Sequence, residues 1–434
     1  MNKQKNKRET GETMKRQLGI YLHIPFCVRK CRYCDFLSFP ADADIRERYV
    51  QRLILEIRSF AQHSAEIFRD TGNESDLPDS ADSTKPGRPE WVVPSIFIGG
   101  GTPSVLSADQ IRRILDAVRS SFTVEEDAEV TMECNPGTDT DFGALLDAGI
   151  NRISLGIQSD DNRMLALLGR IHTWEEAVMT VDKVRRAGFT NLNTDLIFSL
   201  PGQTLQQWRQ TLQRTVSVLN PEHISAYSLI IEEGTPFYDL YHAEDERRAQ
   251  GGAVCLLPDE DTEREMYWET ERFLDKMGYE RYEISNYARR GYRSVHNTGY
   301  WTRREYAGFG IGAASQIGSF RYKNTDDLET YLNKGEQRIP AVRGEKLFFP
   351  VLEEKILLSA EDARSEAMFL GLRMKEGVNL EYFAARYGES AQKVWPGLLQ
   401  KLEAQGLLCH EKNRIRLTDR GTDLSNYVFS MFLQ

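Results

Sequence analysis

The chain has 434 residues with 55 Lys or Arg and 65 Asp or Glu, which gives a formal net charge of −10. This length allows two or three domains, and 40% apolar with 28% charged residues is typical of a soluble globular protein. The absence of any run of about eighteen apolar residues disfavours a membrane span, and the acidic balance disfavours nucleic acid as a partner. Residues 1–17 are basic without the apolar stretch of a secretory signal, so we expect a flexible tail on a cytoplasmic protein with reduced thiols.

A cysteine motif follows the first predicted strand, Gly19–Ile24. Its members have the spacing C-x-x-x-C-x-x-C and are Cys27, Cys31 and Cys34. Three thiolates from one short loop can bind three irons of a [4Fe–4S] cluster and leave the fourth iron without a protein ligand. Structural zinc is the main alternative, and it would require a fourth ligand such as His23. We expect the apolar side chains of Ile24, Phe26 and Phe36 to help exclude water from the thiolates.

Short β-branched runs then alternate with helical patterns as far as residue 231. The runs after the first are Ser95–Ile98, Glu129–Glu133, Arg152–Ile157, Leu192–Phe198 and His223–Ile230. Six strands alternating with helices imply parallel βαβ units that curl into an open sheet or a barrel. We expect an α/β fold with a partial (β/α)6 barrel over residues 18–245. Residues 71–90 contain three prolines and few apolar side chains, which predicts an insertion loop within it.

Polar residues and glycines lie at the carboxyl ends of these strands, where barrel enzymes assemble their active sites. Gly99–Gly101 and Thr102 follow the second strand, Glu133 ends the third, and Gln158 follows the fourth. Asp195 lies within the fifth strand. The glycines would let a ligand approach backbone amides closely, and Glu133 could accept hydrogen bonds from ribose hydroxyls. The sequence therefore predicts one binding site at this rim.

Several motifs resemble the radical S-adenosylmethionine (SAM) family and, within it, the oxygen-independent coproporphyrinogen III oxidase-like proteins. They are Tyr21-x-His-Ile-Pro-Phe-Cys, Cys31-Arg-Tyr-Cys-Asp-Phe, Gly99-Gly-Gly-Thr-Pro-Ser, Leu155-Gly-Ile-Gln-Ser, Leu168-Gly-Arg-Ile-His and Asp195-Leu-Ile-Phe-Ser-Leu-Pro-Gly-Gln. The resemblance implies a [4Fe–4S] cluster with bound SAM, which is cleaved reductively to a 5′-deoxyadenosyl radical. It also implies an electron donor, such as a flavodoxin or ferredoxin, if SAM is cleaved.

The same resemblance implies roles for individual residues. Tyr21, Gly100 and Glu133 would contact the cluster-bound SAM, and Tyr33 belongs to the cysteine signature. The positions that hold a second SAM in the oxidases are matched by Gly101, Thr102, Gln158, Arg170 and Asp195; whether one or two SAM molecules bind stays open. His23 shares a strand face with Tyr21. It is a candidate proton donor or porphyrin contact, with a buried structural histidine as the alternative.

The pattern changes after about residue 245. Residues 246–350 resemble a HemN/HemW-type extension of mixed structure. Residues 351–434 contain three helical segments, two short strands and a final helix, which resemble a winged-helix-like C-terminal α/β domain. Because its third helix carries few basic residues, we expect this domain to serve packing or to act as a lid rather than to bind DNA.

The segment His296-Asn-Thr-Gly-Tyr-Trp carries candidate haem contacts. The imidazole of His296 can ligate haem iron, and Tyr300 and Trp301 can lie against a porphyrin; a core histidine beside two aromatic residues is the alternative. The segment resembles one that marks the HemW-type haem chaperones. Phe36 supports the same resemblance to the chaperones, because the oxidases carry a cysteine at this position, two residues beyond the third cysteine. The resemblance implies haem or a related porphyrin as cargo and haemoproteins as acceptors. An oxidase that decarboxylates coproporphyrinogen III is the alternative, so whether the chain is an enzyme stays open.

Overall fold

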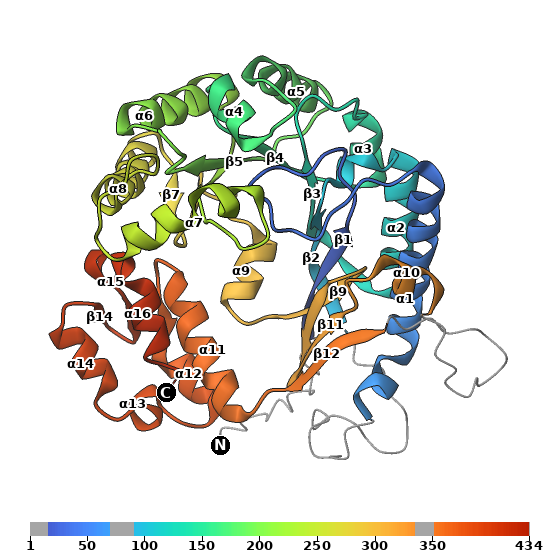
Figure 1. Cartoon of the computed structure of the whole chain (residues 1–434). Coiled ribbons are helices and arrows are strands. Elements are labelled where there is room, and N and C mark those ends of the chain that lie inside the picture. Colours follow the sequence, from blue (N-terminus) through green and yellow to red (C-terminus); the bar gives the residue numbers. More distant parts are fainter. Residues whose placement is uncertain (1–15, 70–90, 335–350, 434) are drawn as a thin grey trace, which may run out of the picture.

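The computed structural model describes residues 16–69, 91–334 and 351–433 (Figure 1). Six parallel strands follow one another in the sheet: β1 Arg16–Ile24, β2 Trp91–Gly100, β3 Thr123–Cys134, β4 Arg152–Gln158, β5 Leu192–Phe198 and β6 His223–Ser228. All six predicted strands are therefore present and parallel. Strand β1 begins inside the predicted tail, whose remaining residues lie outside the described part of the chain, as does the predicted loop 71–90.

Helices cover the outer face of this curved sheet (Figure 1). They are α1 Ala43–Arg69, α2 Ala108–Ser121, α3 Phe142–Ala148, α4 Asn162–Leu168, α5 Trp174–Arg186 and α6 Leu205–Arg214, with short turns at Pro103–Val105 and Thr215–Leu219. Helix α2 illustrates why they form. Ser107 and Gln110 make a reciprocal capping box at its start. Its buried side chains, Ile111, Ile114, Leu115 and Val118, recur at helical spacing and pack against the sheet.

The sheet continues beyond both ends of the six-stranded unit. Strand β9 (Glu305–Phe309) pairs in parallel with β1, and β10 (Ala314–Ile317), β11 (Phe320–Asn324) and β12 (Leu352–Leu357) extend it with antiparallel pairing. Beyond β6 lie β8 (Asn286–Ala288) and β7 (Glu280–Arg281), also antiparallel. The order β12-β11-β10-β9-β1-β2-β3-β4-β5-β6-β8-β7 places β12 and β7 at the two ends of the described sheet. The expected partial barrel is thus confirmed, and its sheet is mixed.

The C-terminal domain lies across the opening of the curved sheet (Figure 1). It contains α11 Ala360–Arg373, β13 Val378–Asn379, α12 Leu380–Tyr387, α13 Ala391–Val394, α14 Leu398–Ala404, β14 Leu408–Glu411, β15 Arg414–Leu417, α15 Asp419–Asp423 and α16 Ser425–Ser430. The three strands form a small sheet, and the domain has an apolar core of its own. Between the barrel strands and this domain come α7 Pro236–Ala249, α8 Glu260–Lys276, α9 Val295–Trp301 and α10 Leu328–Asn333. Helix α9 lies on the inner side of the curved sheet (Figure 1).

Buried ion pairs join the C-terminal domain to the barrel. The Glu366 carboxylate of α11 lies 2.9 Å from Nε of Arg303 and 2.9 Å from Nη2 of Arg321. Because Glu366 and Arg303 are buried, removing one partner would leave an uncompensated charge. These contacts hold the domain against the rest of the chain, and the predicted packing or lid role stays a prediction.

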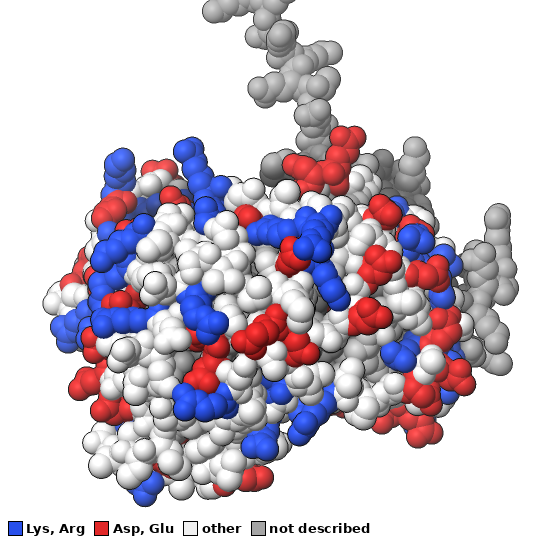
Figure 2. Space-filling model, turned by 90° about the horizontal axis from the view of Figure 1, so that it is seen from above, with Lys and Arg blue, Asp and Glu red and all other residues white. Residues whose placement is uncertain are grey.

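On the surface seen in Figure 2, Lys and Arg are mixed with Asp and Glu, and neither sign dominates that face.

All six cysteines are free thiols. In the described ranges no helix combines the length and the apolarity needed to cross a membrane.

Candidate functional site

The cysteine loop is fixed over the carboxyl ends of the barrel strands by backbone hydrogen bonds. The amide of Cys27 donates to the carbonyl of Phe39 at 3.1 Å, and the amide of Arg32 donates to the carbonyl of Leu168 at 3.0 Å. From the other side, the amide of Phe237 in α7 donates to the carbonyl of Arg32 at 3.0 Å. The loop is thus held by its own return segment, by the end of α4 and by α7.

The three predicted cluster ligands lie together at this rim, half-buried. Burial raises the pKa of the Cys34 thiol, and the neighbouring thiols of Cys31 and Cys27 raise it further. Sγ of Cys27 lies 3.2 Å from Oγ1 of Thr102, and Nη1 of Arg170 donates to Sγ of Cys31 at 3.5 Å. Among the described residues no group of three or more His, Cys, Asp or Glu side chains is arranged to hold a single metal ion. A cluster does not require such a centre, because its thiolates bind different irons.

The glycine triplet Gly99–Gly101, at the end of β2, forms a close backbone contact with this loop. The amide of Gly101 donates to the carbonyl of Ile24 at 2.8 Å, and a Cβ atom on Gly101 would lie 2.7 Å from the carbonyl oxygen of Phe26. At Gly100, φ is +111°, and a Cβ atom would lie 2.6 Å from the His23 ring. Any side chain would therefore displace the cysteine loop or His23, and strain the backbone at Gly100. The triplet needs glycine for space as well as for conformation.

Tyr21 and His23 lie on the same inner face of β1, as predicted. The Tyr21 hydroxyl is 3.0 Å from Nδ1 of His23, and Nε2 of His23 is 3.1 Å from the carbonyl oxygen of Leu37. The carbonyl can only accept, so Nε2 donates and Nδ1 accepts from Tyr21. Burial lowers the pKa of His23. In this arrangement His23 positions the end of the cysteine loop. This matches the alternative that His23 is a buried structural histidine.

Two carboxyl groups, those of Glu133 and Asp195, are close enough on the barrel strands to affect each other, and Glu133 also contacts the glycine triplet. Oε2 of Glu133 accepts from the amide of Gly100 at 3.1 Å. Burial raises the pKa of Glu133 to about 8, with Asp195 as the next cause. Asp195 itself accepts from Nδ2 of Asn193 at 2.8 Å and from Oγ of Ser154 at 3.1 Å, and burial raises its pKa. Glu133 is therefore able to offer a carboxyl proton as well as a lone pair to a ligand at neutral pH.

Arg170 and Gln158 carry buried polar atoms that have no hydrogen-bond partner in the described part of the chain. These atoms are Nε of Arg170 and Oε1 of Gln158. The backbone φ of Gln158 is +68°. Nη2 of Arg170 donates to Oδ1 of Asn135 at 2.6 Å and to the carbonyl of Gly156 at 2.7 Å. Unsatisfied buried polar atoms are costly, so their presence at this rim fits a site that binds a polar ligand such as SAM.

Asn135 is a site residue that the sequence reasoning missed. Its Nδ2 donates to Oγ1 of Thr102 at 2.9 Å, and its Oδ1 accepts from Arg170. It therefore connects the glycine loop after β2 with the segment after α4. The available signal was its place directly after β3 in the turn sequence Asn135-Pro-Gly.

The three predicted aromatic residues near the cysteines differ in burial. The Tyr33 ring packs against Phe237 of α7, with 6.5 Å between ring centroids, and burial raises the Tyr33 pKa. Phe26 is buried, but the Phe36 side chain is 67% exposed. The expectation that Phe36 excludes water from the thiolates is therefore wrong. The loop turns away after Cys34, so this side chain points to solvent.

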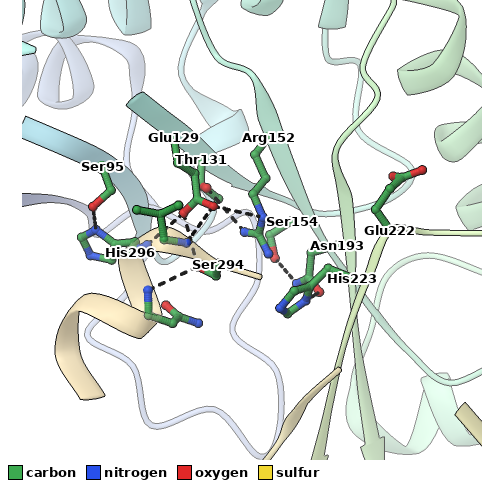
Figure 3. Close-up of polar contacts among 12 residues, drawn as sticks. Ser95, Glu129, Thr131, Arg152, Ser154, Asn193, Glu222, His223, Ser294 and His296 are labelled. Carbon is green, nitrogen blue, oxygen red and sulfur yellow. Dashed lines mark hydrogen bonds and ion pairs between the residues drawn. The ribbon is translucent and has the colours of Figure 1, made fainter. Parts of the chain in front are cut away.

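The amino-terminal half of the barrel interior holds a second polar cluster (Figure 3). The Glu129 carboxylate accepts from the backbone amides of Val295 and His296, each at 3.0 Å, and from Oγ of Ser294 at 3.3 Å. Nε of Arg152 lies 3.8 Å from the same carboxylate. Glu129 thus caps α9 from inside the barrel, where a carboxylate at a helix start is favourable.

Further along this cluster, Nδ1 of His223 lies 2.6 Å from Oδ1 of Asn193, and its Nε2 lies 2.8 Å from the Tyr282 hydroxyl. The sequence reasoning missed the whole cluster. Its signal was polar residues at every second position of β4, β5 and β6.

His296 is buried inside the barrel with both ring nitrogens occupied. Nδ1 lies 3.1 Å from Oγ of Ser95 (Figure 3), and Nε2 lies 3.0 Å from the Tyr300 hydroxyl. The ring stacks on Phe97 at 5.2 Å between centroids, and burial together with Arg304 and Arg152 lowers its pKa to about 3. In this conformation the imidazole is neutral and offers no free nitrogen to haem iron.

The other two candidate haem contacts are also covered. The Tyr300 ring lies between the rings of His296 and Tyr306, at 4.9 and 4.8 Å. The Arg373 guanidinium of the C-terminal domain lies 4.3 Å from the centre of the Trp301 ring. The three predicted residues therefore share one helix, with His296 and Tyr300 packed against barrel strands and Trp301 against the C-terminal domain.

Comparisons with known proteins agree with this architecture. The family models for the radical SAM superfamily and for the HemN C-terminal domain match residues 87–215 and 358–424. Coproporphyrinogen III oxidase (HemN) from Escherichia coli, a radical SAM enzyme, has a similar structure, with a TM-score of 0.73 over 96% of this chain and 90% of that chain. The two are 22% identical, so this likeness concerns the fold alone.

Curated relatives share far more sequence with the chain. It is 36% identical to the haem chaperone HemW of Lactococcus lactis over 96% of this chain and 97% of that protein. Identity to HemW of Bacillus subtilis is 34%, over 96% and 99% of the two chains, and to HemW of Escherichia coli 32%, over 96% and 98%. Identity of this extent along nearly the whole of both chains shows that the protein belongs to the HemW family.

Proposed function

We propose that this protein is a haem chaperone of the cytoplasm, which binds haem together with a [4Fe–4S] cluster and SAM and delivers haem to acceptor haemoproteins. The observation that carries the proposal is the near-full-length match to relatives named haem chaperone HemW. Phe36 supports it, because it stands where the oxidase-like proteins would carry a further cysteine.

The rim site supports the cofactor part of this proposal. Cys27, Cys31 and Cys34 would hold the cluster, whose open iron would bind the amino and carboxylate groups of SAM. The residues that would bind SAM are Tyr21, Tyr33, Gly100, Gly101, Thr102, Glu133, Gln158, Arg170 and Asp195. When bound, the cluster supplies the electron for reductive chemistry on SAM. The protein's own contribution is to fix the thiols, keep the glycine amides accessible and offer the unsatisfied polar atoms of Gln158 and Arg170.

The cluster assignment is tested by substituting Cys31→Ser in anaerobically reconstituted protein. We expect loss of bound iron and sulfide and of the visible cluster absorption. Cys255→Ser is the matched control, because Cys255 is an exposed thiol outside the rim site. A normal cluster content in the Cys31→Ser variant would overturn the ligand assignment.

The function is tested by two parallel assays on the reconstituted protein. In the first, haemin is titrated and the loaded protein is mixed with apomyoglobin as a probe acceptor. We expect stoichiometric haem binding followed by transfer. In the second, the protein is incubated with SAM, dithionite and coproporphyrinogen III. Formation of protoporphyrinogen would replace the chaperone proposal with the oxidase alternative, and failure to bind haem would overturn it directly.

A further inference from the structure

A cavity of about 570 Å³ lies where the end of the mixed sheet meets the C-terminal domain, and none of its lining residues belongs to the cysteine rim. One side is formed by the β7 segment and the turn before α9, and the other by the segment after α11 and the β14–β15 hairpin. This volume lies within the range of small-molecule pockets, which often occur at domain interfaces. The function proposed above assigns nothing to it.

The lining of this cavity is strongly cationic. Six cations face it: Arg281, Arg293, Lys375, Lys412, Arg414 and Arg416. Three carboxylates face it as well: Glu280, Glu376 and Glu411. On a chain with a net charge of −10, such a local excess of positive charge needs an explanation.

Ion pairs neutralise only part of this charge. Arg416 pairs with Glu411 at 2.6 Å, and Arg281 and Lys375 share the single carboxylate of Glu271. Arg293 lies 3.7 Å from Glu280 and 3.8 Å from Glu376. Lys412 and Arg414 have no carboxylate within 4.0 Å among the residues that the structure describes. The positive excess is therefore concentrated at the hairpin tip.

Arg414 is held in place for binding. Its Nη1 donates to the carbonyls of Glu376 and Gly377 at 3.3 and 3.1 Å. These bonds fix the plane of the guanidinium without neutralising its charge. A fixed guanidinium fork matches the paired oxygens of a phosphate group, and less side-chain freedom is lost on binding.

We propose that this cavity binds a compact polyanion, a small molecule that carries a di- or triphosphate group, and that the ligand bridges the barrel and the C-terminal domain. The lining argues against an apolar macrocycle such as haem, since its one large aromatic residue, Tyr282, is fully buried. Several closely spaced negative charges on one small group match several cations around one cavity. Singly charged carboxylates spaced along a peptide match it less well.

The test is calorimetric titration of the full-length protein with inorganic triphosphate at two salt concentrations. We expect 1:1 binding that weakens with salt, and a rise in melting temperature with ligand because the ligand joins two domains. Lys412→Ala with Arg414→Ala should weaken binding roughly 100-fold, because two charge-assisted contacts are lost, and should abolish the shift in melting temperature.

The matched control is Lys401→Ala with Arg420→Ala in the same domain, where the Arg420 guanidinium also donates to a backbone carbonyl, that of Gln405 at 3.1 Å. This control should bind triphosphate normally. Lys412→Ala alone, at an exposed turn, serves if the double variant misfolds, and it should still weaken binding about tenfold. No binding, equal losses in test and control variants, or citrate binding as tightly as triphosphate would each overturn the proposal.

Discussion

Replacing Glu129 by Ala should destabilise the barrel more than any other single change in its polar interior. The carboxylate accepts three hydrogen bonds from the start of α9 and lies 3.8 Å from the Arg152 guanidinium. Arg152 is 2% exposed, and its Nη1 donates a hydrogen bond to Oγ1 of Thr131 at 3.4 Å. The substitution therefore leaves a buried cation without its ion-pair partner.

The expected loss is about 3–5 kcal/mol in the free energy of unfolding, the usual cost of removing one partner of a buried ion pair. Glu129→Gln keeps an acceptor for the α9 amides and should cost less, about 1–2 kcal/mol. Adding Arg152→Met to Glu129→Ala removes the orphaned charge and should restore part of the lost stability.

Urea unfolding followed by far-UV circular dichroism measures these differences. We expect the double variant to be more stable than Glu129→Ala alone. If the double variant is equally or less stable, the uncompensated Arg152 charge is not the source of the loss. If Glu129→Ala leaves the midpoint unchanged, the carboxylate does not hold α9 in place.

Three further changes test other parts of the fold and the rim. Burial raises the pKa of Glu56 to about 7, so the folded state holds this proton more tightly than the unfolded chain. The free energy of unfolding should therefore fall by about 3 kcal/mol between pH 4.5 and 7. Urea titrations at several pH values measure this dependence, and Glu56→Gln should flatten it. Gly101→Ala places a methyl group against the Phe26 backbone and should cost about 1–3 kcal/mol and lower cluster content, measured as iron per protein; normal values of both would contradict the crowding at this position. Asn135→Ala removes the link between Thr102 and Arg170 and should weaken SAM binding roughly tenfold in equilibrium dialysis, whereas unchanged affinity would place SAM elsewhere.

The six barrel strands could be predicted because buried parallel strands leave a local pattern of β-branched runs between amphipathic helices. The rim site followed from that pattern, since the carboxyl ends of parallel strands meet at one edge. The extension of the sheet by β9 to β12 carries no such pattern. There Gly308 and Gly310 are needed because the chain passes close to other atoms: a Cβ atom on Gly308 would clash with the carbonyl of Ala314, and one on Gly310 with the Tyr49 hydroxyl. A glycine-rich segment that forms a tight hairpin resembles an irregular loop in sequence.

The surroundings of individual side chains were the other feature that could not be predicted from the sequence. The motif around His296 identifies a family but does not say whether the imidazole faces a ligand or the core. The hydroxyls of Ser95 and Tyr300 decide this, and they come from β2 and from the next turn of α9. Exposure of Phe36 likewise depends on the path of the loop after Cys34, which no local pattern encodes.

The buried position of His296 leads to a prediction about haem. For haem iron to reach this imidazole, α9 must leave the barrel, which breaks three hydrogen bonds to Glu129 and one to Ser95, and the Tyr300 hydroxyl must leave Nε2. At about 1 kcal/mol for each bond, the open form costs about 5 kcal/mol and would weaken haem binding roughly 10³- to 10⁴-fold. If His296 is the ligand, Glu129→Ala should therefore strengthen haem binding, because it lowers the cost of opening.

Haemin titrations of Glu129→Ala, of His296→Ala and of His242→Ala, a histidine of α7 outside the barrel interior, separate the two possibilities. Tighter binding in Glu129→Ala together with a lost Soret shift in His296→Ala would make α9 a gate that opens to present the ligand. Unchanged affinity in both variants would place haem outside the barrel. The segment would then be a structural plug, because its imidazole is already satisfied by Ser95 and Tyr300 and its helix start by Glu129.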